Sequence, residues 1–453
     1  MKPFLLPFFF CLVPDLFAIP NSPHAVRTSR TLPTAAHSVP FSKKVPRRTG
    51  ATHSLQKRST HTVPLAGSDF DANYVVNATI GGQNFTLLID TGSADTWVPQ
   101  QGFSCFSLTG SPVPAATCNF GPTFDVNGST TFEPFENVSF NITYGTGFFV
   151  AGPVGFETLS VGELEVAHQI VPVPNIAGWE ADGIQSGILG LAFPNETSLF
   201  NTSDPANVSV ENRIPYNPFF LTAVNQKKVE HPYFSIALNR PTADQEEHDS
   251  YDPNLGFLAF GGIAPVPVIH NTSTTIPVQG FNSNGTAPGD TFFWHAISID
   301  SYNFPGCENV PEAHNASLAG GSTILDTGTA LNLVPAPVAA AYAAAFDPPA
   351  QLVNITGLSL YTAQCNATVP PFSVTIGGQE FTMDPRDQLL PVVTDATGDV
   401  VCIGGTQARG GPDISADFHL LGDVFLRNVV ATFNPIDKGE SYPFTENIVV
   451  IEG

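Results

Sequence analysis

The sequence predicts an all-β protein built from two related lobes with a cleft between them. Apolar residues make up 42% of the 453-residue chain and charged residues only 13%, while 41 prolines and 39 glycines punctuate it. This composition favours short strands joined by tight turns over long amphipathic helices. The clearest helical stretch, residues 337–346, is short and rich in alanine. A motif that occurs twice indicates two similar halves, each large enough for its own core.

The duplicated motif is an apolar run that delivers an aspartate into a Thr-Gly turn and leaves through Val-Pro. The first copy spans residues 87–99 and contains Asp90, and the second spans residues 323–335 and contains Asp326. A carboxylate that directly follows an apolar strand is costly to bury unless it is hydrogen-bonded or shares a proton with a partner. We therefore expect the two aspartates to be each other's partner.

Each half also repeats a second feature at nearly the same distance from its aspartate. The apolar stretch 187–191 follows Asp90, and the stretch 420–423 follows Asp326, each with a glycine after apolar residues. The sequence thus predicts two lobes of similar construction, each contributing one aspartate to a shared boundary.

In these motifs the chain resembles the pepsin-like aspartic endopeptidases, in particular secreted acid proteases of the fungal type. The resemblance rests on both Asp-Thr-Gly segments, on the Tyr-Gly-Thr-Gly segment 144–147, on the apolar-Gly stretches and on Trp97. It extends from about Tyr74 to the end of the chain. It implies a bilobal pepsin-like fold with an active-site cleft between the lobes. It also implies that Asp90 and Asp326 activate a water molecule to hydrolyse peptide bonds at acid pH.

The residues beside the aspartates have expected supporting roles. Glycine permits a tight turn with backbone N–H groups facing each carboxylate. By the resemblance, the threonines that follow the aspartates lock the two loops together, and a hydroxyl in each loop binds an outer carboxylate oxygen. The supporting residues are Thr91, Gly92, Ser93, Thr327, Gly328 and Thr329.

Residues 140–150 read as a β-hairpin, with apolar strands around a Gly-containing turn. By the resemblance this hairpin is the flap that covers a bound substrate, formed around Tyr144, Gly145 and Thr146, with Trp97 as hydrogen-bond support for Tyr144. Some relatives carry an acidic residue where this chain has Thr146. Its absence favours bulky hydrophobic residues around the scissile bond over basic ones.

The N-terminal region predicts export. Residues 1–18 combine Lys2, an apolar run over residues 4–13 and the small residue Ala18, as in a secretory signal peptide. Residues 19–58 hold eight of the 17 basic residues and no acidic one, whereas the chain beyond them holds every acidic residue except Asp15. A basic arm is attracted to an acidic body at neutral pH, and this attraction weakens as carboxylates protonate.

We therefore expect residues 19–58 to be a pro-segment that covers the cleft and acts as an intramolecular inhibitor. The dibasic pair Lys57-Arg58 predicts a processing site, with Ser59 as the mature start. The alternative is a disordered basic tail that binds a polyanion. The rest divides into an N-terminal lobe over residues 59–240, an acidic connector over residues 241–255 and a C-terminal lobe over residues 256–453.

Five cysteines remain after the signal peptide. Cys105 and Cys118 lie close together in the first lobe, and Cys365 and Cys402 lie in the second, so these pairs are the expected disulfides of a protein from an oxidising compartment. Similar bridges occur at these places in the family. Cys307 is left over, and no His/Cys spacing indicates a metal site. Thirteen Asn-x-Ser/Thr sequons suit a glycoprotein.

The expected protein is a secreted monomer, made as a zymogen, that acts on extended polypeptides without cofactor or metal. We expect no nucleic-acid or membrane partner, and an acidic vacuole is the alternative location. A rival from another class is a catalytically inactive protein of the same fold that binds a peptide or inhibits another enzyme. A secreted structural glycoprotein would explain the sequons but not the duplicated motif. Neither Gly-x-Ser-x-Gly nor His-Glu-x-x-His is present.

Overall fold

The computed structural model describes residues 37–41, 73–240, 255–269, 272–282, 289–314, 322–355, 358–394, 400–409, 418–435 and 447–452. The expected signal peptide, the Lys57-Arg58 pair and all but the last residue of the expected connector lie outside the described residues. In the described part strands dominate and helices are short, which confirms the prediction of a mostly β protein.

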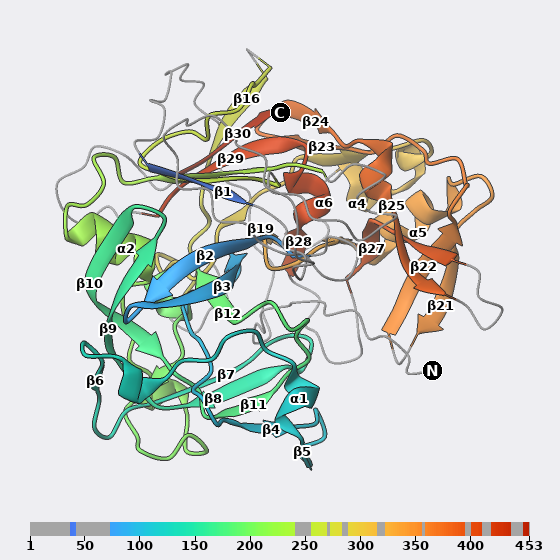
Figure 1. Ribbon diagram of the computed structural model, residues 1–453. Coiled ribbons are helices and arrows are strands. Elements are labelled where there is room, and N and C mark those ends of the chain that lie inside the picture. The colour runs from blue at the N-terminus through green and yellow to red at the C-terminus, as the bar shows by residue number, and fades with distance from the viewer. Residues whose placement is uncertain are drawn as a thin grey trace, which may run out of the picture.

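Two sheets form the first lobe, in blue to green in Figure 1. The central strand β3 is buried from Phe85 to Asp90 because β2 and β12 flank it. Its side chains alternate between two apolar clusters, with Leu87 and Ile89 in one and Leu88 in the other. One sheet has the order β10 (Leu164–Pro172), β9 (Val154–Val161), β2 (Val75–Ile80), β3 (Gln83–Asp90), β12 (Gly187–Gly190), with β6 (Glu133–Pro134) beside β9. The other has the order β13 (Leu199–Phe200), β7 (Ser139–Thr143), β8 (Phe149–Gly152), β11 (Ile176–Gly178), β4 (Ser104–Phe106), β5 (Pro112–Val113).

The second lobe, in yellow to red in Figure 1, contains three sheets. One has the order β17 (Ala296–Ile297), β19 (Ser322–Leu325), β28 (Phe418–Leu421), β20 (Asn332–Val334), β27 (Thr406–Ala408). The next joins β18 (Ser301–Asn303), β23 (Ser373–Ile376) and β24 (Gln379–Thr382). The last joins β21 (Gln351–Ile355), β22 (Leu358–Gln364), β26 (Val400–Gly404) and β25 (Leu389–Thr394).

The helices are brief. The alanine-rich stretch expected to be helical forms α5 (Ala336–Ala344), so that prediction is confirmed to within two residues. Pro337 stands in its first turn, where proline is well suited because the backbone N–H that it lacks would have no partner within the helix. The other α-helices in the described part of the chain are α1 (Ala115–Cys118), α2 (Phe219–Asn225), α4 (Pro311–His314) and α6 (Asp423–Leu426). Among the described residues no helix is long and apolar enough to cross a membrane.

A sixth sheet of the described residues is built from both halves of the chain. Its order is β1 (His37–Phe41), β15 (Gly256–Phe260), β14 (Phe234–Leu238), β29 (Val429–Asn434), β30 (Asn447–Glu452), β16 (Ser273–Pro277). The last strand of the first half, β14, pairs with β15 and β29 of the second half. The basic stretch 19–58 contributes β1, which pairs antiparallel with β15. The part of this stretch that the structure describes is therefore a sheet strand.

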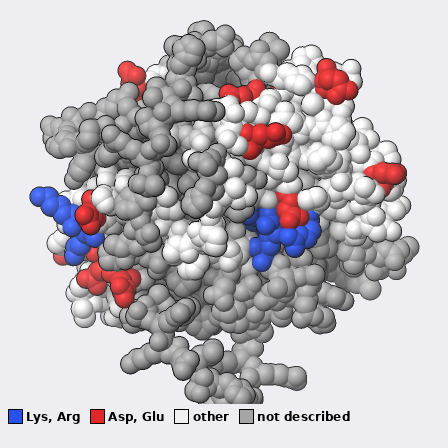
Figure 2. Space-filling model, turned by 90° about the horizontal axis from the view of Figure 1, so that it is seen from above, with Lys and Arg blue, Asp and Glu red and all other residues white. Residues whose placement is uncertain are grey.

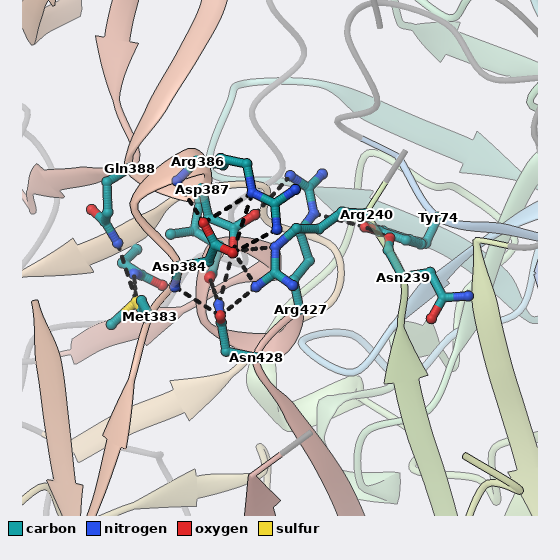
Figure 3. Close-up of polar contacts among 12 residues, drawn as sticks. Tyr74, Asn239, Arg240, Met383, Asp384, Arg386, Asp387, Gln388, Arg427 and Asn428 are labelled. Atoms are coloured by element: carbon teal, nitrogen blue, oxygen red, sulfur yellow. Dashed lines mark hydrogen bonds and ion pairs between the residues drawn. The ribbon is translucent and has the colours of Figure 1, made fainter. Parts of the chain in front are cut away.

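A polar network joins the end of the first lobe to the second (Figure 3). Arg240 donates two hydrogen bonds to Asp387, at 2.8 and 2.6 Å, and Asn428 donates a third at 2.9 Å. Arg427 approaches the other carboxylate oxygen at 3.7 Å and donates at 2.7 Å to Tyr74, near the start of the first lobe. Arg427 is only 8% exposed, so its charge depends on these partners.

We predict that Asp387→Ala lowers the free energy of unfolding by roughly 3 to 5 kcal/mol, because it removes one partner of a buried ion pair. Urea denaturation followed by tryptophan fluorescence measures this loss. The matched control is Arg386→Ala, because Arg386 pairs with Asp384 at the surface. That exposed pair is worth at most about 1 kcal/mol. Equal effects of the two substitutions would contradict the assignment of the buried network.

Candidate active site

In each lobe the aspartate of the duplicated motif lies at the end of an equivalent pair of parallel strands. Asp90 ends β3, which pairs in parallel with β12 so that Gly190 lies opposite Asp90. In the other lobe β19 pairs in parallel with β28 and ends one residue before Asp326. The repeated glycine stretches of the sequence are thus the strands that flank each aspartate. Both aspartates are buried, at 3% and 2% exposed.

Each carboxyl group lies against the glycine of the opposite loop. A Cβ added at Gly92 would lie 2.6 Å from Oδ1 of Asp326, and one added at Gly328 would lie 2.5 Å from Oδ1 of Asp90. Carbon atoms cannot approach so closely, so only glycine leaves room for the opposite carboxyl group. The reciprocal arrangement brings the two aspartates face to face.

The first loop surrounds Asp90 with donors. The backbone N–H groups of Gly92 and Ser93 donate to Oδ1 of Asp90 at 2.8 and 3.1 Å. The Ser93 hydroxyl donates to the other carboxylate oxygen, Oδ2. Both oxygens therefore have partners within their own turn.

The second loop repeats this pattern around Asp326. Gly328 donates its backbone N–H to Oδ1 at 2.8 Å, and the Thr329 hydroxyl donates to Oδ2 at 2.6 Å. Ser93 and Thr329 therefore occupy equivalent places, as expected from their equivalent positions in the motif.

Thr91 and Thr327 cross-link the two loops through four hydrogen bonds. The Thr91 hydroxyl donates to the carbonyl of Leu325 at 2.7 Å, and the Thr327 hydroxyl donates to that of Ile89 at 2.9 Å. Each hydroxyl also accepts the backbone N–H of the other threonine, at 3.1 and 3.0 Å. Because these bonds are buried and cross between lobes, they fix the two aspartate loops relative to each other.

The electrostatic environment favours a pair of carboxyl groups that keeps one proton. Burial raises the pKa of Asp90, against the opposing effects of the Ser93 hydroxyl and the Gly92 N–H. Burial also raises the pKa of Asp326, well above its ordinary value, and the negative charge of Asp90 raises it further. Two carboxyl groups so close together lose their protons in separate steps, and these steps belong to the pair.

The expected flap is a hairpin of β7 and β8 in which Tyr144, just before the turn, packs into an aromatic cluster. Tyr144 follows β7 and is 1% exposed, with Gly145 and Thr146 next along the turn. The indole N–H of Trp97 donates to the Tyr144 hydroxyl at 2.8 Å. The Trp179 ring lies 5.1 Å from Trp97 and 5.4 Å from Tyr144, edge-on to both. Sequence reasoning missed Trp179, because nothing local marks it.

Three further carboxyl groups near the aspartates were also missed. Asp95 accepts hydrogen bonds from the Tyr216 hydroxyl at 2.6 Å and from the Ser198 N–H at 3.0 Å. Burial raises the pKa of Asp95 to about 6 and that of Glu196 to about 8. Asp423 is fully buried at the start of α6, and burial raises its pKa well above the ordinary value. Asp95 and Asp423 lie within the motif stretches, so their positions were the available signal.

The cysteines pair as the sequence predicts. Disulfides join Cys105 to Cys118 and Cys365 to Cys402, and Cys307 is a free thiol. Within the described ranges, no group of three or more His, Cys, Asp or Glu residues is arranged to hold a metal ion.

Comparisons with known proteins agree with this geometry. The family model described as eukaryotic aspartyl protease matches residues 73–440. A probable aspartic-type endopeptidase of Aspergillus fumigatus is 37% identical over 365 residues, which cover 80% of this chain and 76% of that protein. Penicillopepsin-1 of Penicillium janthinellum is 27% identical, over 80% of this chain and 92% of its own length. The crystal structure of an aspartic proteinase from Irpex lacteus superposes with a TM-score of 0.60 at 17% identity, covering 92% of this chain and 97% of that one.

We predict that Thr327→Val lowers the free energy of unfolding by roughly 2 to 4 kcal/mol, because it leaves the Ile89 carbonyl and the Thr91 N–H buried without partners. The control is Thr222→Val on α2, whose hydroxyl makes a surface hydrogen bond. We expect a change of at most about 1 kcal/mol there. Chemical denaturation of both variants decides the matter, and a Thr327 variant as stable as the control would show that the cross-link carries little stability.

Proposed function

The chain belongs to the eukaryotic aspartyl protease family and is an aspartic endopeptidase, and on this premise we propose that Asp90 and Asp326 are its catalytic pair. The observation that carries the proposal is the reciprocal packing of each carboxyl group against the glycine of the opposite loop. Such packing of two carboxyl groups from different lobes supports a site in which one water molecule binds both.

In the proposed reaction, one member of the pair is ionised and accepts a proton from the bound water. The resulting nucleophile adds to the carbonyl carbon of the peptide bond, while the protonated member donates its proton to the carbonyl oxygen. The tetrahedral diol then collapses, the C–N bond breaks, and the amine leaves with a proton returned by the pair. No covalent intermediate forms. The base and acid roles belong to the pair, since its members share a proton.

The expected pH dependence follows from the pKa directions. Activity requires one proton on the pair, and the raised pKa of Asp326 holds that proton as the pH rises from acid values. Activity therefore falls when the pH passes the upper pKa of the pair. We propose operation at acid pH, which also suits the formal net charge of −23.

The proposed substrate is an extended polypeptide held between the pair and the flap. Tyr144, Gly145 and Thr146 are assigned to the flap, and the hydrogen bond from Trp97 to Tyr144 supports a fixed position of the phenol ring. Thr146 offers no charge to a basic substrate side chain. Bulky hydrophobic residues are therefore the proposed preference around the scissile bond.

We also propose that the protein is secreted as a zymogen, with residues 1–18 as signal peptide and residues 19–58 as inhibitory pro-segment. Support comes from the pairing of β1 with β15 and from the opposite charges of the segment and the body. Figure 2 shows acidic side chains scattered over one face, where the basic ones gather in small groups. The mature enzyme would be an extracellular monomer divided at residues 241–255 into its two lobes, with an acidic vacuole as the alternative location.

We predict that Asp90→Asn and Asp326→Asn each lower the rate of peptide-bond cleavage by at least about 1000-fold, because either change removes an acid–base group. The assay is digestion of an unfolded protein between about pH 3 and pH 7, the range in which carboxyl pairs titrate. The control is Asp290→Asn at an exposed position, which should retain full activity. Circular dichroism checks that each variant folds, and a folded, fully active Asp326→Asn variant would refute the assignment.

We predict that replacing both Lys57 and Arg58 by Ser leaves the proenzyme uncleaved at this site during secretion, because the dibasic recognition signal is gone. N-terminal sequencing of the secreted wild type should give Ser59, and the variant should retain part or all of residues 19–58. An unchanged mature N-terminus in the variant would place the processing site elsewhere.

A further inference from the structure

The segment Leu191 to Glu196 of the first lobe contacts residues 292–295 of the second, and we call this contact the seam. The backbone N–H of Phe193 donates to the carbonyl of Phe293 at 3.2 Å. The Asn195 side chain donates to the carbonyl of Phe292 at 3.0 Å, which makes its sequon a poor acceptor for a glycan. The imidazole of His295 lies 2.9 Å from the carbonyl oxygen of Leu191.

His295 connects the two aspartate loops through backbone groups. Leu191 donates its N–H to the carbonyl of Asp90 at 2.8 Å, and its own carbonyl receives the His295 imidazole. On the other side, the His295 carbonyl accepts the N–H of Leu325 at 3.1 Å, and Asp326 follows directly. This route is separate from the threonine cross-link and depends on one titratable side chain.

The surroundings of the imidazole fix its protonation state. A carbonyl oxygen can only accept, so the bond to Leu191 requires the proton on Nε2. The other ring nitrogen, Nδ1, is buried and has no hydrogen-bond partner. His295 is 0% exposed, and its ring lies 4.8, 5.8 and 4.7 Å from the rings of Phe193, Phe234 and Phe433. A second proton would create a buried cation whose Nδ1–H faces no acceptor.

We propose that His295 is a positioning residue for the catalytic pair, and that its protonation loosens the seam and sets the acid limit of activity. The inference rests on the proposed function of Asp90 and Asp326. Below this limit the enzyme would still hold a proton on the pair, but the two loops would lose their alignment.

Charged groups on the neighbouring elements do not offset this effect. The strands that carry Phe234 and Phe433 contain no titratable side chain, and neither do β17 and β19. Burial lowers the pKa of His295 to about 4, opposed only by the Leu191 hydrogen bond. The seam itself carries one titratable side chain besides His295, that of Glu196. Asp90 and Asp326 are connected to His295 only through the backbone hydrogen bonds of Leu191 and Leu325.

Glu196 titrates in the opposite sense. Burial raises its pKa to about 8, with the charges of Asp95 and Asp90 acting in the same direction and Arg213 and the Trp294 indole opposing. Glu196 is therefore uncharged at the acid pH at which His295 takes up its proton. It gives the cation no counter-charge there.

The sign of the stability effect follows from proton binding. An unfolded histidine titrates near its ordinary value of 6.5, whereas folded His295 titrates near 4. Between these values the unfolded chain binds more protons, so stability falls as the pH falls through this window. Below about pH 4 the folded protein also binds the proton and carries it in the seam.

The test variant is His295→Gln, whose side-chain amide can donate to Leu191 but cannot be protonated. We expect the acid limb of the kcat profile, compared with the maximal kcat of the same variant, to move at least about one pH unit lower than in the wild type. The thermal unfolding midpoint below pH 4 should rise. An acid limb unchanged in a folded His295→Gln enzyme would overturn the proposal.

Two matched variants distinguish a positioning role of His295 from a general effect of buried groups on the stability of the protein at low pH. His419→Gln removes another buried histidine, on β28, whose pKa burial lowers to about 3. We expect it to leave the acid limb of kcat in place. Glu196→Gln should also leave the acid limb of kcat unchanged. When measured at a pH above neutral, its thermal unfolding midpoint should be higher than that of the wild type. If His419→Gln moved the acid limb as far as His295→Gln, the special role of the seam would be refuted.

A measurement on protein with His295 intact covers the case in which its variant does not fold. With ring-labelled histidine in the His419→Gln background, NMR should show one imidazole titrating near pH 4 together with the acid limb of kcat. If every imidazole titrates near its ordinary value, the proposal fails. Because the titration and the unfolding midpoints do not require catalysis, they test the seam even if the Asp90→Asn and Asp326→Asn variants contradict the proposed function.

Discussion

The structure depends on burying two carboxyl groups side by side at the boundary of two lobes. Asp90 and Asp326 come from strands 236 residues apart, yet each fits against the glycine of the opposite loop. Burial without partners would expel such charges, so every oxygen is given a donor from its own turn. The threonine cross-link then fixes the separation of the loops. A shared proton is the electrostatic consequence, and the proposed chemistry uses this proton.

This constraint explains why so many contacts cross between the lobes. A small relative shift would separate the carboxyl groups, so the lobes must be held at several places. The sheet that runs from β1 to β16 mixes strands of both halves, and the Asp387 network attaches the end of the first lobe to the second. The seam at His295 is joined by hydrogen bonds to backbone groups of both aspartate loops. These contacts lie at different places, from the shared sheet to the aspartate loops. Together they limit both the rotation and the separation of the two lobes.

The sequence was sufficient for the fold class and for the positions of the aspartates, because the duplication repeats a local pattern. An apolar run, a Thr-Gly turn and a later apolar-Gly stretch can each be read within a few residues. Trp179, Glu196 and His295 could not be found in this way. Trp179 and His295 act through contacts with residues distant in the sequence, Trp97 and Leu191, and Glu196 is marked only by its burial. The pro-segment was expected over the cleft, while the part that the structure describes forms β1 in the sheet.

The same burial that would let the proposed catalytic pair share a proton imposes limits on the surrounding protein. An environment that raises the pKa of Asp326 also raises those of Asp95, Glu196 and Asp423, and it lowers that of His295. Acid keeps the four carboxyl groups neutral and therefore favours the folded state, whereas it charges the imidazole and opposes it. The two effects act on the same boundary with opposite signs. A histidine that links the aspartate loops therefore restricts function from the acid side, while the buried carboxyl groups restrict it from the neutral side, and the working range lies between them.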